Sequence, residues 1–105
     1  MSTSKSNSWE LDAIDALILQ DGLRIQSLYF SKELNLMLIV LNNRKVLQRD
    51  LSDFARLYNA QEEDLNRFEL GLTGVHWPTL DEDLSLRGFL QYEMLIALGG
   101  NKAVA

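Results

Sequence analysis

The pattern of apolar and polar positions predicts a small antiparallel sheet in the first half of the chain. Residues 23–30 partly alternate polar with apolar side chains, as a half-buried strand does. Residues 36–41, LMLIVL, are apolar at every position, which is typical of a strand covered on both faces, at the centre of a sheet or in an interface. The pair Asn42-Asn43 suits a tight turn, because asparagine tolerates positive φ. Residues 44–50 can then return as the third strand of a meander.

Residues 9–20 fit two different elements. Asn7 and Glu10 could cap a helix with Ile14 and Ile18 on one face. Alternatively, Asp21-Gly22 is a hairpin signal that would pair residues 16–19 with residues 23–29. We prefer a strand after about Ala13, and the helix stays open as the alternative.

In the second half the apolar period becomes helical. Ser52 can cap a short helix that places Phe54 and Leu57 or Tyr58 inward, and residues 61–70 predict a second helix with Leu65 inward. A last helix, capped by Asp83 or Ser85, carries several apolar side chains on one side and ends at Gly99-Gly100. These side chains are Leu86, Phe89, Leu90, Met94 and Leu95.

The predicted fold class is therefore α+β, with a small antiparallel β-meander of three or four strands, two short helices and a C-terminal helix. Residues 9–98 form one domain in this interpretation. The serine-rich residues 1–8 and residues 99–105 are expected to be flexible ends.

Composition narrows the function classes. The 105 residues carry 10 Lys and Arg against 15 Asp and Glu, a net charge of −5, which argues against nucleic acid and anionic membranes as partners. The absence of cysteine excludes disulfides, thiolate zinc sites and cysteine nucleophiles. No secretory signal is visible and no apolar run approaches the ~20 residues of a membrane helix, so we expect a cytoplasmic protein.

The charge is unevenly distributed along the chain. Residues 1–50 hold six bases and six acids, whereas residues 51–105 hold four bases and nine acids. Acids in the first turn of the predicted second helix stabilise the helix dipole, and the others are available to a partner. Seven of the nine acids lie close together: Glu62, Glu63, Asp64, Glu69, Asp81, Glu82 and Asp83.

His76 is the only histidine, and the carboxylates Asp81, Glu82 and Asp83 follow it closely. One interpretation is a divalent-metal site or a general base, for which His76, Asp81 and Asp83 are the weaker candidates. The preferred interpretation is structural, with Trp77 buried and Asp81 or Asp83 capping the last helix. We therefore expect no catalytic residue, no bound metal and no cofactor.

The bases Arg44, Lys45 and Arg49 cluster on and after the Asn42-Asn43 turn. No aromatic residues are interleaved with them, as they would be in many nucleic-acid-binding surfaces. We interpret them as charges that protect an edge strand from aggregation.

The stretch GVHWPTLDEDLSLRGFL, residues 74–90, resembles the hallmark of a small bacterial domain-of-unknown-function family, number 2442. The resemblance extends over residues 24–90. It implies an α+β fold and no established activity, and it implies that members accompany another small protein family in an arrangement similar to toxin–antitoxin pairs. Asp50 and Ala55 stand where the family commonly has proline. Only 15 residues follow Leu90, too few for the DNA-binding extension of some members.

These observations favour a non-enzymatic protein-interaction domain of regulatory or adaptor type, with an acidic surface that binds a protein partner. The alternatives are an antitoxin-like neutraliser of a small companion protein and a metal-dependent hydrolase that uses His76, Asp81 and Asp83. A second copy of the chain is another expected partner, through Leu36, Leu38 and Val40. The candidates for the partner face are His76, Trp77, Asp81, Glu82, Asp83, Glu62 and Glu63.

Overall fold

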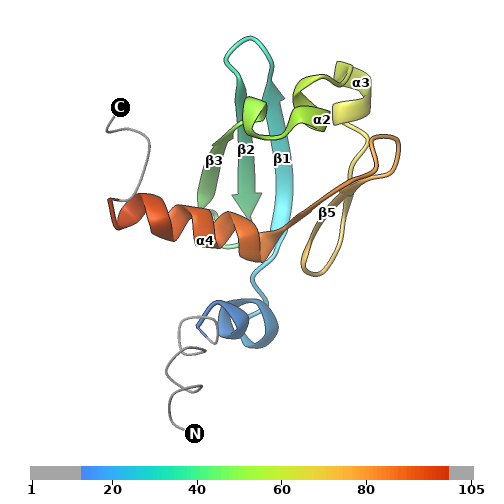
Figure 1. Ribbon diagram of the computed structural model, residues 1–105. Helices are drawn as coiled ribbons and strands as arrows, with labels where there is room; N and C mark the ends of the chain where they lie inside the picture. The colour runs from blue at the N-terminus through green and yellow to red at the C-terminus, as the bar shows by residue number, and fades with distance from the viewer. Residues whose placement is uncertain (1–12, 100–105) are drawn as a thin grey trace, which may run out of the picture.

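The computed structural model describes residues 13–99 and has an α+β fold (Figure 1). Two three-stranded antiparallel sheets have the strand orders β1-β2-β3 and β4-β5-β6. Short helical segments connect them, and the long helix α4 (Leu86–Ala97) follows the last strand. The predicted fold class is confirmed, although the second sheet is an addition to the predicted meander.

The first sheet is the meander that the apolar pattern predicts. Its strands are β1 (Ile25–Ser31), β2 (Leu36–Leu41) and β3 (Val46–Asp50), with β2 in the centre. Opposite residues such as Tyr29, Leu38 and Gln48 form cross-strand rows. The all-apolar strand therefore occupies the central position expected of it.

The turn between β2 and β3 uses its asparagines for hydrogen bonds rather than for positive φ. The residue with positive φ is Arg44, at 75°. Asn43 Oδ1 accepts a hydrogen bond from Lys45 N at 3.0 Å. Asn42 Oδ1 accepts one from Arg24 N, and Asn42 Nδ2 donates to Gly22 O. The turn lies where the sequence predicts it, but asparagine side chains rather than asparagine backbone conformations stabilise it.

The preferred strand after Ala13 is wrong, because residues 13–15 are helical and continue into the π-helical segment η1 (Ala16–Gln20). Ile14 and Ile18 are both buried at the spacing of a helical face. Gly22, with φ of 73°, follows the end of this helix instead of forming a hairpin turn. The proposed cap, Asn7 with Glu10, lies outside the described residues.

The two short helices are shorter than predicted. The first is divided into η2 (Leu51–Asp53) and α2 (Ala55–Tyr58), and the second, α3 (Glu62–Leu65), is a single turn. The predicted ten-residue helix ends early because Phe68 packs edge-on against Phe30 and Trp77, so that Glu69 and Leu70 continue as strand β4 of the second sheet.

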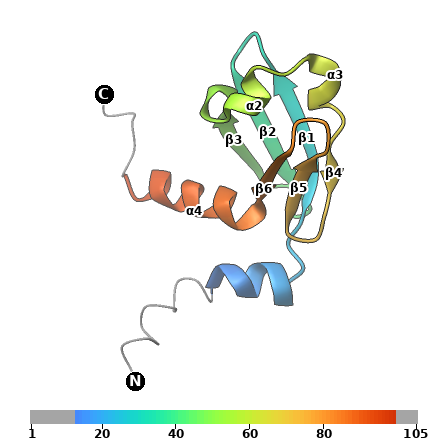
Figure 2. The ribbon, with the colours of Figure 1, turned by 45° about the vertical axis from the view of Figure 1, so that its right-hand side comes forward.

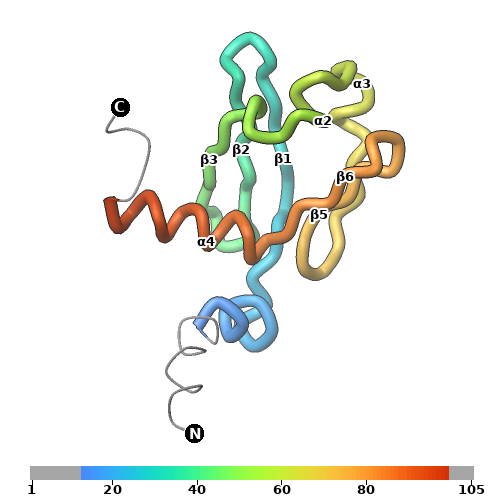
Figure 3. The backbone as a smooth tube through the Cα atoms, viewed as in Figure 1, coloured from blue at the N-terminus to red at the C-terminus, as the bar shows by residue number. Residues whose placement is uncertain are grey.

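The second sheet consists of β4 (Glu69–Leu70), β5 (Gly74–Trp77) and β6 (Glu82–Ser85), and Figure 3 shows its chain path. A Cβ on Gly74 would lie 2.4 Å from the carbonyl oxygen of Leu84, so only glycine permits this close approach of β5 and β6. The sequence analysis predicts no strand here: it assigns residues 69–70 to the second short helix and gives residues 74–85 no strand.

The core lies between the first sheet, the second sheet and α4, and Figure 2 shows the last two on the same side of the first sheet. The inner face of β2, with Met37, Ile39 and Leu41, is buried there. On the opposite, outer face, Leu36, Leu38 and Val40 are only half-buried. The largest fully buried side chains of the core are Trp77, Met37, Ile39, Leu51, Leu57, Leu65 and Leu86.

Helix α4 begins where one of the two predicted caps lies: Ser85 Oγ accepts a hydrogen bond from Gly88 N at 2.9 Å. Leu86 and Phe89 are buried, but Met94 and Leu95 are 39% and 57% exposed, contrary to the prediction. The reason is geometric, because the second half of α4 extends past β3 at the edge of the first sheet (Figure 1). Within residues 13–99 no helix has the length and apolar character needed to cross a membrane.

Candidate functional site

The first part of the motif of residues 74–90 forms a hairpin, in which a turn joins β5 to β6. Its register places His76 opposite Asp83 and Trp77 opposite Glu82. Asp81 lies in the turn with φ of 52°. Because successive side chains of a strand point to opposite faces, Val75 and Trp77 point into the core and His76 points outward.

Trp77 belongs to the core. It has no exposed surface, and its indole Nε1 donates a hydrogen bond of 2.9 Å to the carbonyl oxygen of Leu65. Phe30 and Phe68 contact its ring edge-on. The structure therefore places this partner-face candidate where no partner can reach it, and its role is to attach the hairpin to α3 and β1.

His76 and Asp83 meet across the hairpin, with His76 Nδ1 2.7 Å from Asp83 Oδ1. Their side chains are 41% and 76% exposed. Glu69 of β4 is the partner of His76 on the other side, and an open pocket of about 490 Å³ adjoins these three residues. The sequence analysis missed this pairing, although a hairpin centred between Thr79 and Leu80 places residues 76 and 83 opposite each other.

Asp81, the third residue of the suggested metal site, lies elsewhere. Its carboxylate is 3.7 Å from the guanidinium of Arg56, which also donates a hydrogen bond to the Asp81 carbonyl oxygen. Within residues 13–99, no group of three His, Asp or Glu side chains is placed to hold a metal ion. The structure thus joins His76 to Asp83 and separates Asp81 from both. Neither Asp81 nor Asp83 caps α4, since Ser85 does so.

The acids of α3 lie beside this hairpin. Glu62, Glu63 and Asp64 occupy the first turn of α3, as predicted from the sequence. Thr79 Oγ1, in the β5–β6 turn, donates a hydrogen bond of 3.4 Å to Asp64 Oδ1. Figures 1 and 2 both show α3 next to this turn. We call the surface formed by Glu62, Glu63, Asp64, Asp81, Glu82 and Asp83 the acidic end.

Few bases offset this charge. Residues 56–85 contain seven acids and two bases, Arg56 and Arg67, a balance of −5 that equals the net charge of the whole chain. Glu62, Glu63, Asp81 and Asp83 are exposed, while Glu82 is half-buried. The acidic end therefore carries accessible carboxylates, and the nearby bases are too few to neutralise them.

β3 is an edge strand, since it has only β2 as a neighbour in its sheet, but Arg49 is the one base of the cluster that lies on it. The Arg49 guanidinium carbon lies 3.6 Å from the ring centroid of Tyr92, and its Nη2 is 3.3 Å from Asp53 Oδ2. Arg49 therefore attaches α4 to the first sheet. Arg44 and Lys45 are exposed at the turn that precedes β3.

Two comparisons with known proteins match this chain. A family described as "Protein of unknown function (DUF2442)" matches residues 25–94. The uncharacterized protein CV0863 of Chromobacterium violaceum, solved by NMR in solution, is 23% identical, with a TM-score of 0.60 over 89% of this chain and 94% of its own. This likeness shows a shared fold. No curated protein matches the chain.

Proposed function

Since the chain belongs to the DUF2442 family of proteins of unknown function, we propose from its geometry that it is a non-enzymatic protein-interaction domain of regulatory or adaptor type. Its acidic end binds a basic surface of a protein partner. The observation that carries this proposal is that the folded chain brings α3 and the β5–β6 turn together, so that residues 56–85 concentrate a charge of −5 on one part of the molecule.

The contacts of the acidic end support a binding role. Complementary charges across an interface steer association and select partners. Asp81 and Asp83 each contact one base or histidine, yet their side chains remain 93% and 76% exposed. They can therefore form new ion pairs without leaving a buried charge. The hairpin that carries them is held in place through Trp77, so the carboxylates are displayed on a supported element.

The same geometry gives less support to the metal-dependent hydrolase. That mechanism needs His76, Asp81 and Asp83 to converge on one reacting group, and Asp81 contacts Arg56 instead. The His76–Asp83 pair alone supplies two polar groups on an exposed face.

A narrower form of the proposal is an antitoxin-like role, in which the acidic end covers a basic site of a small companion protein. Its test is co-expression of the chain with the product of the neighbouring gene. Complex formation and rescue of growth support the role, while the absence of both would exclude that gene product as the companion.

The general proposal is tested with two variants that remove the same number of charges. The variant E62Q/E63Q removes two of the six carboxylates of the acidic end, and the control D21N/E93Q removes two exposed carboxylates away from it. We expect the wild-type chain and the control to retain a stoichiometric protein partner from native lysate, and E62Q/E63Q to bind it at least several-fold more weakly.

Isothermal titration with the purified partner at low and high salt measures this difference, because exposed charge pairs weaken as salt is added. Two results contradict the proposal. One is that no stoichiometric partner is recovered, and the other is that both double variants bind with unchanged affinity.

A further inference from the structure

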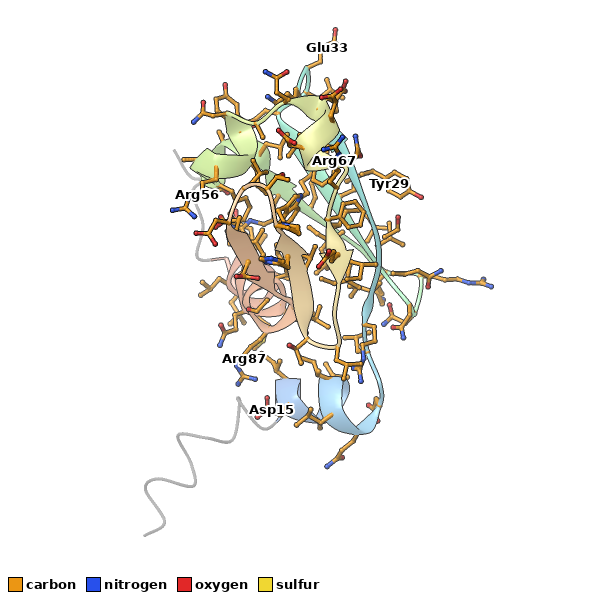
Figure 4. The ribbon with its side chains drawn as sticks, turned by 90° about the vertical axis from the view of Figure 1, so that its right-hand side faces the viewer. Asp15, Tyr29, Glu33, Arg56, Arg67 and Arg87 are labelled. Carbon is orange, nitrogen blue, oxygen red and sulfur yellow. The ribbon has the colours of Figure 1, made fainter. Side chains whose placement is uncertain are left out.

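The outer face of the first sheet is open in the described residues. The second sheet and α4 lie against the opposite face (Figure 2), and Figure 4 shows Tyr29 of β1 pointing away from the second sheet. On this outer face Tyr29 and Val46 are 59% and 53% exposed. A sheet face that contacts water normally carries polar side chains at alternate positions.

This face is apolar along its central strand. Leu36, Leu38 and Val40 occupy the alternate positions of β2 that point outward. The register pairs Leu38 with Tyr29 and Val40 with Val46, so the five side chains form one continuous patch. A single exposed apolar side chain is ordinary, whereas a contiguous patch with a polar border is typical of an interaction surface.

Charges of opposite sign border the two ends of this patch. Arg44 and Lys45 lie in the β2–β3 turn, at one end of the strands. Glu33 lies in the β1–β2 turn at the other end, where Asp50 pairs with Leu36. Within residues 13–99, none of the ion pairs involves Arg44, Lys45, Glu33 or Asp50.

Other charged residues near the two ends do not reverse this polarity. Asp21 and Arg24, close to the basic end, carry opposite charges. At the opposite end of the patch, beside Glu33 and Asp50, the Lys32 ammonium donates a hydrogen bond to the Ala60 carbonyl oxygen. The patch is therefore basic at one end of the strands and acidic at the other.

We propose that the outer face binds a second copy of this chain, with the strands of the two sheets antiparallel. A two-fold axis in the plane of the interface, perpendicular to the strands, places Leu38 against the partner's Leu38. It also places Arg44 and Lys45 of each copy near the partner's Glu33 and the partner's Asp50. The parallel arrangement would bring like charges together. None of these residues belongs to the acidic end, so this proposal and the proposed function can fail independently.

The size of the patch predicts the strength of the dimer. The strands have seven, six and five residues. At roughly 3.3 Å per residue and 4.8 Å between strands, the face is about 20 Å long and 10–15 Å wide. That footprint is smaller than the ~800 Å² per partner of a standard stable interface. We therefore expect a dimer that forms at micromolar or higher concentration and dissociates on dilution.

Sedimentation equilibrium from low micromolar to millimolar protein tests the dimer. The wild-type chain should change from monomer to dimer over this range, and Leu38→Lys should remain monomeric. The matched control Leu95→Lys places the same charge on an exposed leucine of α4 and should dimerise like the wild type. Circular dichroism of each variant verifies that it is folded.

A wild-type chain that stays monomeric at millimolar concentration overturns the proposal, as does a Leu38→Lys variant that dimerises normally. If Leu38→Lys instead loses the protein partner recovered from lysate while the wild type stays monomeric, the face belongs to that partner and not to a second copy.

Charge reversal tests the complementary ends. Arg44→Glu/Lys45→Glu makes both ends acidic, and Glu33→Lys/Asp50→Lys makes both ends basic. Each variant alone should dimerise at least tenfold more weakly than the wild type, and an equimolar mixture should restore the dimer. Unchanged dimerisation of either variant alone would show that these charges do not meet across the interface.

The orientation is tested by cysteine cross-linking, which the absence of cysteine from the chain makes simple to interpret. In the proposed arrangement Val46 of one copy lies near the partner's Asp50. A mixture of Val46→Cys and Asp50→Cys in a glutathione redox buffer should give a disulfide-linked dimer, and Val46→Cys alone should not. Preferential linkage of Val46→Cys to itself would contradict the antiparallel arrangement.

Discussion

At the scale of single residues, the motif side chains divide into structural and accessible ones. Trp77 and Gly74 are required by packing, the first as a buried ring with a hydrogen-bonded indole and the second as the only residue that fits against Leu84. His76 and Asp83, which pair across the hairpin, are partly exposed. A motif that looks like one chemical unit in the sequence thus serves two purposes, support by one set of residues and display by the other.

The most sensitive residue is expected to be Trp77. Trp77→Phe keeps an aromatic ring but removes the hydrogen bond to the buried Leu65 carbonyl and leaves a cavity. We expect the free energy of unfolding to fall by about 1–3 kcal/mol. Urea denaturation followed by circular dichroism measures this change.

Tyr58→Phe is the control, because Tyr58 is 48% exposed. Its effect should stay within about 0.5 kcal/mol. Equal stabilities of Trp77→Phe and the wild type would show that the indole hydrogen bond contributes nothing measurable.

At the scale of elements, the sequence predicts a helix or strand correctly where the element depends on contacts between residues close together in the chain. The meander, the acids in the first turn of α3 and the capping of α4 by Ser85 depend on such contacts. Predictions were wrong where a distant contact overrides a local one. Residues 66–70 do not continue the helix, since Glu69 and Leu70 join the second sheet, and residues 13–20 form a helix despite the Asp21-Gly22 pair.

The cap of α4 is testable by substitution. Ser85→Ala removes the oxygen that accepts the Gly88 N–H, which should lower the free energy of unfolding by about 0.5–2 kcal/mol. Ser85→Asp retains an acceptor and should keep most of the stability. Thermal denaturation of the three proteins measures the order wild type, Ser85→Asp, Ser85→Ala. A Ser85→Asp variant as unstable as Ser85→Ala would contradict the capping role.

At the scale of the whole molecule, one hydrophobic cluster joins both sheets, α4 and η1. It includes Ile18, Ile39, Trp77 and Phe89. Since no described element has a separate core, the two sheets should unfold together.

Coincident transitions would show this cooperativity. Trp9→Phe leaves Trp77 as the only tryptophan, so its fluorescence reports on the hairpin while far-ultraviolet circular dichroism reports on all elements. In urea the two signals should have the same midpoint. A fluorescence transition at clearly lower urea would show that the second sheet unfolds separately.

The sequence by itself determined the properties that depend on counting and on near neighbours. These are the charge of −5 and its concentration in the second half, the all-apolar central strand and the acids that begin α3. Only the tertiary structure decided which distant residues meet. It placed His76 against Asp83, Trp77 against Leu65, and Asp64 against Thr79, and among the described residues it left the outward side chains of the central strand only half-buried. The physical reason is that burial and long-range pairing are properties of the folded chain, because they depend on how all elements share one core.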